Sequence, residues 1–199
     1  MSYEPVANGE LAAVVTFLEM HQPPPAAAPN ASPLSLRTID RPDLDDYRRW
    51  FRLVGSRWLW FSRLLLSDAE LAAIIHHERV SVFPIVDDQA GEVGLLELDF
   101  RIDGECEVAF LGLVPEFAGQ GHGRWVLAEA LNLAWREGIS RVHVHTCSLD
   151  HPAALSAYRR AGFIPYKRAV ERFRDPRLLG VLPRDCAPQV PLLGTETSA

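Results

Sequence analysis

Long apolar stretches are missing from this sequence, and so is an excess of basic residues. No uninterrupted apolar run approaches the roughly 18 residues that a membrane-spanning helix needs, and the amino terminus has no basic segment followed by an apolar core. We therefore expect a cytoplasmic protein with no membrane partner. The formal net charge of −6 argues against nucleic acid as a partner, because phosphate binding needs clustered Lys and Arg, and it favours a cationic or amine-bearing substrate.

Cysteine is scarce as well, and the chain is short. The three cysteines, Cys106, Cys147 and Cys186, are odd in number and widely spaced, which fits neither a disulfide framework nor a paired zinc motif. A chain of 199 residues, 48% of them hydrophobic and 23% charged, can bury one sizeable core but not two. The composition therefore predicts a single domain with tails.

The chain divides into three parts. Residues 1–33 hold one candidate strand at 14–20 and a Pro/Ala-rich linker, and we expect them to be peripheral. Residues 34–174 carry regular apolar patterns and form the predicted domain. Residues 175–199 are a Pro-rich tail whose apolar residues need burial, either on the domain or on a second subunit. A homodimer is therefore one expectation.

Apolar periodicity predicts alternating strands and helices within the domain. Strands are expected at 34–39, 80–86, 93–102, 105–114, 141–147 and about 163–173. Helices are expected after Pro42, over 68–77 behind a Ser67–Glu70 capping box, after the glycines at 119–123, and from Pro152. A helix separates the strands at 105–114 and 141–147, so these two should be parallel. The aromatic cluster of Trp50, Phe51, Trp58 and Trp60 fits either a core or a pocket wall.

Gly119, Gly121 and Gly123 lie between a predicted strand and a predicted helix. Such a turn lets the backbone approach an anion, and the free amides of the helix N-terminus point at phosphate oxygens. A Walker loop is excluded, because no Gly-Lys-Ser/Thr follows. A dinucleotide-binding oxidoreductase is disfavoured, because Arg124 stands where its fingerprint needs Gly or Ala. A cradle for the pyrophosphate of coenzyme A remains.

Two motifs in residues 34 to about 173 resemble the GNAT superfamily of acyl-CoA-dependent N-acetyltransferases. The family motif Q/R-x-x-G-x-G/A falls on residues 118–123, where the two glycines match and Ala118 departs. A second motif, N-x-x-A-x-x-L-Y-x-K-x-G-F, resembles HPAALSAYRRAGF at 151–163. Its matching residues are Ala154, Tyr158, Gly162 and Phe163, whereas His151 replaces Asn and Ala157 replaces Leu. The strings HTCSLDHPAAL and DPRLLGVLPRDCAP resemble a bacterial subgroup, which implies no particular substrate.

The resemblance implies a fold and a cofactor. The fold is α+β with α/β/α layers: a mixed, mostly antiparallel, twisted sheet of about six to seven strands with helices on both faces. Acetyl-CoA would be the acyl donor, without a metal. Leu113 and Val114 would offer backbone amides to the pantetheine and the thioester carbonyl, at a bulge where two strands splay apart. The coenzyme A site carried over from the family comprises Leu113, Val114, Gly119, Gln120, Gly121, His122, Gly123, Arg124, His151 and Ala154.

The resemblance also implies catalysis by Tyr158 and Glu107. Tyr158 matches the family tyrosine that donates a proton to the coenzyme A sulfur. Glu107 lies where some members keep a glutamate that deprotonates the amine, and burial would raise its pKa. The acceptor would be an amine of a small molecule or of a protein. A non-catalytic acyl-CoA-binding module is the alternative, which would not need the acid at Tyr158.

Glu97 and Asp99 compete with Glu107 as the base. If the turn at 103–104 closes a two-residue hairpin with both residues at positive φ, Phe100 pairs with Glu107. Glu97 and Asp99 would then point to the face opposite Glu107, and only one set could reach the cleft. The base is therefore left open among Glu107, Glu97, His145 and water.

His143, His145 and Cys147 alternate along one predicted strand, and Asp150 and His151 follow closely. A zinc site is conceivable for such a pattern. Successive same-face residues on a strand are about 6.6 Å apart, however, so packing histidines or a base role for His145 are better interpretations. We expect no metal.

Overall fold

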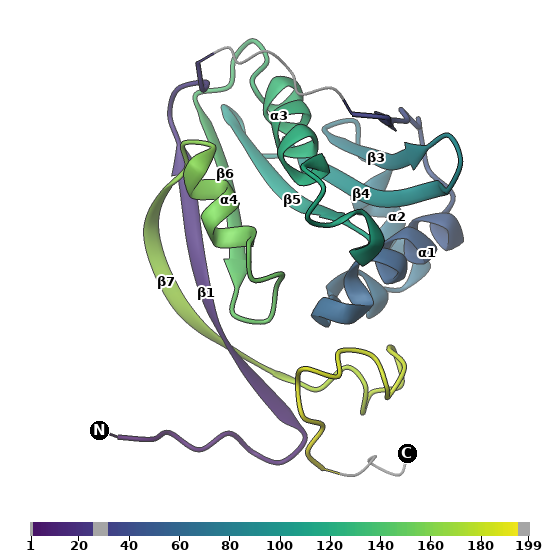
Figure 1. The fold of residues 1–199 in the computed structure, drawn as a ribbon, viewed down its shortest axis with the longest axis vertical. Coiled ribbons are helices and arrows are strands. Elements are labelled where there is room, and N and C mark those ends of the chain that lie inside the picture. The colour runs from purple at the N-terminus through teal and green to yellow at the C-terminus, as the bar shows by residue number, and fades with distance from the viewer. Residues whose placement is uncertain (1, 26–31, 195–199) are drawn as a thin grey trace.

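The computed structural model describes residues 2–25 and 32–194, which form one seven-stranded sheet (Figure 1). The strand order is β2-β3-β4-β5-β6-β1-β7. The strands are β1 (Glu10–Met20), β2 (Leu34–Leu36), β3 (Val80–Asp87), β4 (Gly91–Asp99), β5 (Glu105–Leu113), β6 (Arg141–Cys147) and β7 (Ile164–Arg174). The β5–β6 pair is parallel and the others are antiparallel. The predicted mixed, mostly antiparallel sheet is confirmed.

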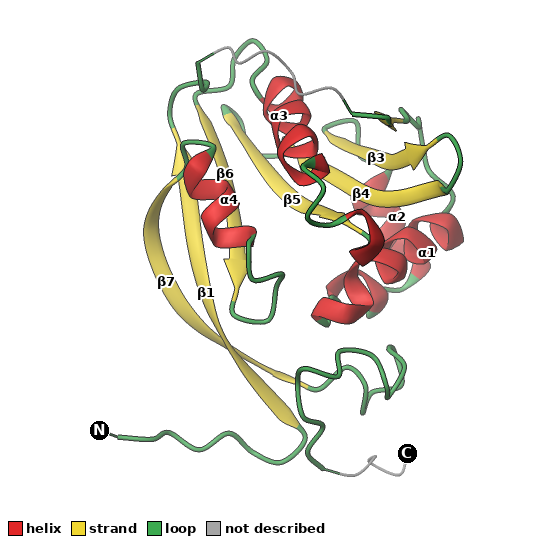
Figure 2. Cartoon of the chain, in the orientation of Figure 1, coloured by secondary structure: helices red, strands yellow, loops and turns green. Residues whose placement is uncertain are grey.

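Helices cover both faces of the sheet. They are α1 (Leu44–Gly55), α2 (Asp68–Ile75), α3 (His122–Ala134) and α4 (Ala154–Arg160). Neighbouring residues of β4 point to opposite faces: Leu95 packs with α1 and α2, whereas Leu96 packs with α3 and α4, which lie in front of the sheet in Figure 2. The predicted α/β/α layering is confirmed. None of the helices in the described residues is long and apolar enough to cross a membrane.

The first two helices begin where their capping residues predict. The Asp43 carboxylate accepts bonds from the amides of the first turn of α1, which buries Tyr47 and Phe51 at helical spacing. Ser67 and Glu70 form the predicted capping box of α2, each side chain bonding to the other residue's backbone amide. Both helices thus present an apolar stripe to the same face of the sheet.

The position of β1 corrects the expectation that residues 1–33 are peripheral. β1 lies between β6 and β7 and pairs antiparallel with both. Leu18, near its end, is fully buried. A strand enclosed on both sides has no unpaired edge, so it belongs to the middle of the sheet and not to a tail. Residues 26–31 of the predicted linker lie outside the described residues.

The β4–β5 hairpin differs from the prediction by one residue. Gly104 has a φ of 75°, but Asp103 is not among the residues with positive φ, so the turn is not the predicted type. Asp99, and not Phe100, lies opposite Glu107. Directly opposed residues point to the same face, so the expectation that Asp99 and Glu107 face opposite ways is wrong.

The tail after β7 folds back onto this chain. Leu178 and Leu182 are buried, with 6% and 3% of their surface exposed. Arg177 and Asp175 form an ion pair whose side chains are each 2% exposed, and the Arg177 guanidinium also donates to the Val190 carbonyl at 2.8 Å. Burial of these leucines therefore requires no second subunit.

We expect Arg177→Met to lower the free energy of unfolding by about 3–5 kcal/mol, because the Asp175 carboxylate is left buried without a counter-charge. Urea unfolding measures this change. Arg172→Met, which removes an exposed pair with Glu4, is the control and should change stability by less than about 1 kcal/mol. Equal effects of the two substitutions would contradict an anchoring role for Arg177.

Candidate active site

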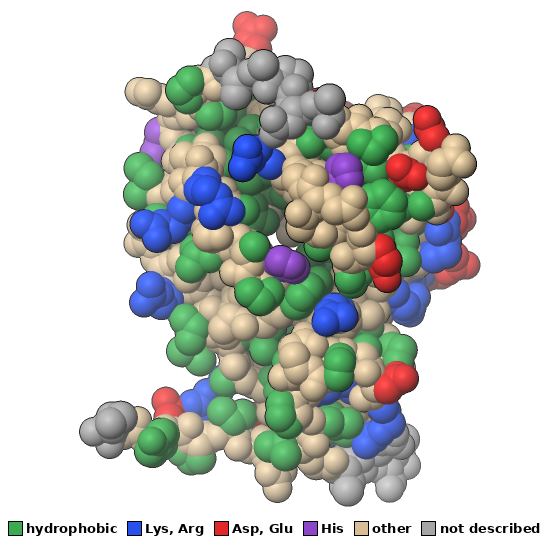
Figure 3. Space-filling view, viewed as in Figure 1, with side chains coloured by type: hydrophobic (Ala, Val, Ile, Leu, Met, Phe, Trp, Pro, Cys, Tyr) green, Lys and Arg blue, Asp and Glu red, His purple; other side chains and the backbone are tan. Residues whose placement is uncertain are grey.

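The two parallel strands of the sheet stay together for only a short distance. Residues 105–107 of β5 pair with residues 141–143 of β6, and no later residues of these two fully described strands pair with each other. The ribbons diverge from that point (Figure 1). A cavity of about 1780 Å³ opens between them and is lined by residues from both faces of the sheet. The molecule is visibly hollowed there (Figure 3).

A bulge in β5 marks the point of separation. Leu98 of β4 lies opposite Val108, but Glu97 lies opposite Phe110, so Ala109 has no partner on β4. Ala109 lines the cavity. A bulge at a splay between parallel strands is the arrangement that the family resemblance implied.

Backbone amides beyond the bulge face the cavity. The Val114 amide donates to the Val93 carbonyl at 2.8 Å, so Val114 is not the free donor that we expected. Because alternate residues of an antiparallel strand bond to the same neighbour, the amides of Leu113 and Leu111 point away from β4. Both residues line the cavity. The structure therefore keeps Leu113 as a candidate donor and adds Leu111 in place of Val114.

The glycine turn leads from the end of β5 into α3. Gly119 and Gly121 have φ values of 80° and 90°, and a Cβ at either of them or at Gly123 would meet no atom within 4 Å. No side chain caps the first turn of α3. Within the described chain, the amides of residues 119–123 have no hydrogen-bond acceptor. The turn thus presents a row of uncovered donors, which suits a phosphate group.

The remaining predicted residues of this turn divide into two groups. The Gln120 side chain donates to the Glu116 carbonyl at 2.8 Å, and His122 Nδ1 lies 3.2 Å from Ser32 Oγ. Neither residue lines the cavity, whereas Arg124 does. Arg124 therefore supplies positive charge beside the glycines, and Gln120 and His122 hold the turn in place.

The His151 side chain bonds to the backbone just before α4, whose N-cap residue Ala153 has no side-chain cap. His151 Nδ1 accepts a bond from the Ala153 amide at 3.1 Å, and the His151 carbonyl accepts one from Ala154 at 2.8 Å. Its ring lies edge-on to Trp58, 5.2 Å between centroids. His151 and Ala154 both line the cavity.

Tyr158 reaches the cavity from α4, on the face of the sheet that carries α3. It is 8% exposed, and its ring packs against Phe163 with 5.8 Å between centroids. Burial, and secondarily the charge of Asp150, raise the pKa of Tyr158 above its ordinary value. The phenol is therefore protonated at neutral pH, as a proton donor must be.

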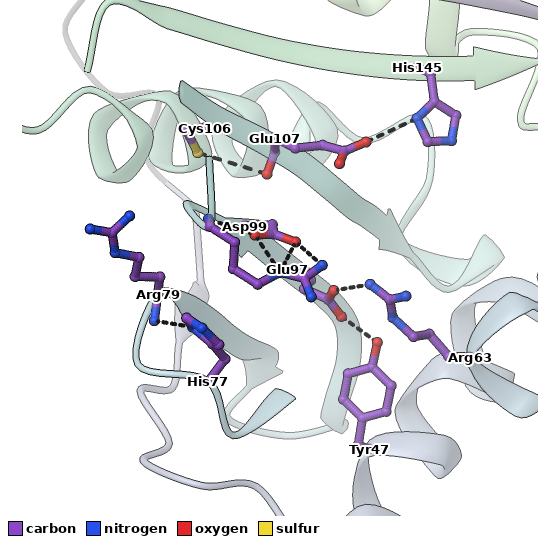
Figure 4. A network of polar contacts seen from close by, with 10 residues as sticks. Tyr47, Arg63, His77, Arg79, Glu97, Asp99, Cys106, Glu107 and His145 are labelled. Atoms are coloured by element: carbon purple, nitrogen blue, oxygen red, sulfur yellow. Dashed lines mark hydrogen bonds and ion pairs between the residues drawn. The ribbon is translucent and has the colours of Figure 1, made fainter. Parts of the chain in front are cut away.

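Glu107 and His145 meet across the gap between β5 and β6 (Figure 4). Glu107 Oε1 lies 3.2 Å from His145 Nδ1, and both residues line the cavity. The bond from His145 lowers the pKa of Glu107 and outweighs the opposing effect of burial, so the expected raised pKa is wrong. The same bond raises the pKa of His145. The pair therefore favours a carboxylate beside an imidazolium.

The two competing carboxylates are already occupied (Figure 4). Glu97 is fully buried and accepts bonds from the Tyr47 hydroxyl and from Arg63 Nη2, the latter at 2.6 Å. Asp99 is paired with Arg101 at 2.6 Å. Neither carboxylate is positioned to take a proton from a substrate without first losing its cation.

The sequence indicated Asp150 only as part of a conceivable zinc pattern, whereas the structure gives it a different role beside the cavity. Its carboxylate accepts bonds from the Cys147 amide at 2.8 Å and from Trp60 Nε1 at 3.3 Å, which ties the end of β6 to the segment after α1. Trp58 and Trp60 line the cavity, so half of the aromatic cluster is pocket wall. Trp50 and Phe51, in contrast, are buried core. Asp150 follows a strand in a tight turn, a signal that could have indicated this role.

The histidines of the conceivable zinc site contact glutamates. Among residues 2–25 and 32–194, no group of three or more His, Cys, Asp or Glu side chains is arranged around a common point. His143 and His145 each face a different glutamate, Glu105 and Glu107 respectively.

Comparison with known sequences identifies the family. Residues 43–163 match the model of the acetyltransferase (GNAT) family. This chain belongs to that family. It is similar to an N-alpha-acetyltransferase RimI of Mycobacterium tuberculosis, with 38% identity over 73 residues, which are 37% of this chain and 44% of that protein. The chain thus matches less than half of this GNAT relative's length.

Solved structures confirm the GNAT fold. A GCN5-related N-acetyltransferase from Sphaerobacter thermophilus superposes with a TM-score of 0.57 at 21% identity, over 84% of this chain and 52% of that one. An aminoglycoside acetyltransferase from an uncultured soil metagenomic sample superposes with a TM-score of 0.52 at 17% identity, over 65% of this chain and 87% of that one. The chain spans about half the length of the first structure.

The two neighbouring histidines should titrate in opposite directions. We expect the His145 imidazole to titrate above its ordinary pKa because of its bond to Glu107, and His143 below its own, because burial disfavours its charged form. Imidazole C–H resonances followed by NMR across pH measure both values. Glu107→Gln should lower the pKa of His145. A His145 midpoint at or below that of His143 would contradict the pairing.

Proposed function

We propose that this GNAT protein transfers the acetyl group of acetyl-CoA to an amine of a small molecule or of a protein. One observation carries the proposal: the glycine turn, the unpaired edge of β5 and Tyr158 all line one continuous cavity. That cavity would offer an anion cradle, a row of backbone donors and a proton donor to a thioester of coenzyme A. The RimI relative, named as an N-alpha-acetyltransferase, supports an amine acceptor. We place the reaction in the cytoplasm, as the sequence suggests.

Different parts of the cavity suit different parts of coenzyme A. The uncovered amides of residues 119–123 and the guanidinium of Arg124 would bind the pyrophosphate. The strand edge at Leu111 and Leu113 would bind the amide groups of the pantetheine arm as an added strand would. His151 and Ala154, which also line the cavity, would contact the arm from the α4 side.

The reaction needs three things from this chain. The thioester carbonyl must be polarised, and the backbone of β5 near the bulge at Ala109 would do this with a fixed amide. The leaving thiolate must receive a proton, which the protonated Tyr158 would supply. The amine must lose a proton, for which Glu107 is the residue expected from the family. These roles come from opposite sides of the gap, so the thioester would lie between them.

Titration calorimetry with acetyl-CoA tests the cradle. We expect Gly121→Trp to weaken binding at least about tenfold, because its side chain would occupy the space before the uncovered amides. Gly91→Trp is the matched control: Gly91 also has positive φ, at 78°, and an equally open surround, but it is the first residue of β4, directly after the β3–β4 turn. Undetectable binding to the wild type, or equal loss in both variants, would remove the proposed function.

Turnover depends on Tyr158. We expect Tyr158→Phe to leave acetyl-CoA affinity within about twofold and to lower thiol release about 100-fold or more, because general acid catalysis is lost. Thiol release is measured by a colorimetric thiol assay with a panel of primary amines and amino-terminal peptides. Tyr166→Phe, on β7 away from the cavity lining, should have no effect. Binding without turnover in the wild type would favour the acyl-CoA-binding module instead.

A further inference from the structure

Two histidine–glutamate pairs lie one after the other on β5 and β6. His143 Nε2 lies 3.5 Å from Glu105, and His145 Nδ1 lies 3.2 Å from Glu107. His143 and Glu105 are located where the two strands are still paired, and neither lines the cavity. His145 and Glu107 lie at the point of separation and line it together. The second pair alone is in reach of a molecule that occupies the cavity.

The bond to Glu107 fixes the form of the His145 ring. An ionised carboxylate can only accept a hydrogen bond, so Nδ1 must carry the hydrogen. In the neutral ring the lone pair is then on Nε2, the nitrogen that faces away from Glu107 (Figure 4). In the described part of the chain no residue is hydrogen-bonded to this nitrogen. Nε2 is therefore available to accept a proton.

We propose that His145 Nε2 accepts the proton of the nucleophile, and that Glu107 is a positioning residue which holds the ring and its tautomer. The proposal rests on the acyl transfer proposed above and changes the role of one residue in it. It accounts for the position of Glu107, whose carboxylate is directed at a histidine on the neighbouring strand. Val142 and Val144 of β6 pack with Tyr158 in one core cluster. Because side chains alternate along a strand, His145 points to the opposite face of the sheet from Tyr158.

Each proton and electron pair of the acyl transfer has a donor and an acceptor. The nucleophile forms a bond to the thioester carbon and gives its proton to His145 Nε2, while the carbonyl π pair moves to oxygen. When that pair returns, the C–S bond breaks and the thiolate takes the Tyr158 proton. The His145 side chain is 48% exposed, so the imidazolium can release its proton to solvent. Tyr158 is reprotonated from solvent, and no oxidant or further reactant is needed.

The carboxylates around His145 raise its pKa, so the ring becomes a neutral base at a higher pH than an ordinary histidine does. The Glu107 carboxylate is the largest influence, and it raises the pKa of His145. On the far side, the ring of Phe17 on β1 lies 5.8 Å away, and Lys167 of β7 stacks on Phe17. The negative charges of Asp150 after β6 and Glu171 on β7 also raise the pKa of His145, and His143 on β6 lies close enough for its own pKa to be lowered by His145. Asp99 on β4 acts on Glu107.

Hydrolysis of acetyl-CoA by water gives the sharpest test. Water has no pKa in the working range, so the rising limb of thiol release against pH reports the base of the enzyme alone. We expect His145→Gln to remove this limb and to lower the rate at pH 8 by roughly 10²–10⁴-fold, with acetyl-CoA affinity unchanged. Glu107→Gln keeps an acceptor for Nδ1–H but loses the charge. Its limb should therefore shift to lower pH, with a smaller loss of rate.

His143→Gln is the matched control, because it removes a histidine of the neighbouring pair without reaching the cavity. It should leave the pH profile of the wild type unchanged. A full limb in His145→Gln, or an unshifted limb in Glu107→Gln, would overturn the proposal, as would a wild type that binds acetyl-CoA but releases no thiol to water or amines. Failure of acetyl-CoA to bind at all would instead remove the function on which the proposal rests.

Discussion

The functional architecture depends on the early end of one parallel strand pair. β5 and β6 bond to each other at three residues each and then separate. Beyond that point the backbone of β5 has donors and acceptors with no strand beside them, and burial without partners would be costly. A ligand with amide groups of its own can satisfy these donors and acceptors. The split in the sheet therefore opens the cavity and also favours the binding of such a ligand in it. The bulge at Ala109 sets where the split begins.

The split also lets side chains from both faces of the sheet act on one point. Tyr158 comes from the layer of α3 and α4, whereas Glu107 and His145 point to the layer of α1 and α2. In a continuous sheet these groups would be separated by the thickness of the backbone. In the reaction that we propose, the proton donor and the proton acceptor would therefore lie on either side of the thioester without neutralising each other.

Much of this arrangement could be predicted from sequence, because its signals are local. The Ser67–Glu70 capping box, the glycine turn and the parallel pairing of β5 with β6 each depend on a short segment or on one connection. One error is local: the Asp99–Glu107 register follows from a turn that differs from the expected one. The other errors are non-local, and the place of β1 is set by strands far along the chain. The Glu107–His145 contact, which reverses the expected pKa of Glu107, crosses between strands separated by a helix.

The sheet has two arms, one on each side of the cavity: β2 to β5, and the set of β6, β1 and β7. Because β1 is inserted between β6 and β7, the two arms form in different ways during folding. In the arm of β2 to β5, the strands β3, β4 and β5 form a meander whose neighbours are close in sequence. The other arm joins β6 to β7 only through β1, which places Glu10 opposite Arg174. Such pairing must wait for almost the whole chain and carries the entropy of a long closed loop. During synthesis the first arm can form as it emerges, but β1 has no strand to pair with until β6 has left the ribosome, and β7 can be added only after that. β1 is thus made well before both of its neighbours, and β7 joins the sheet only by pairing with it.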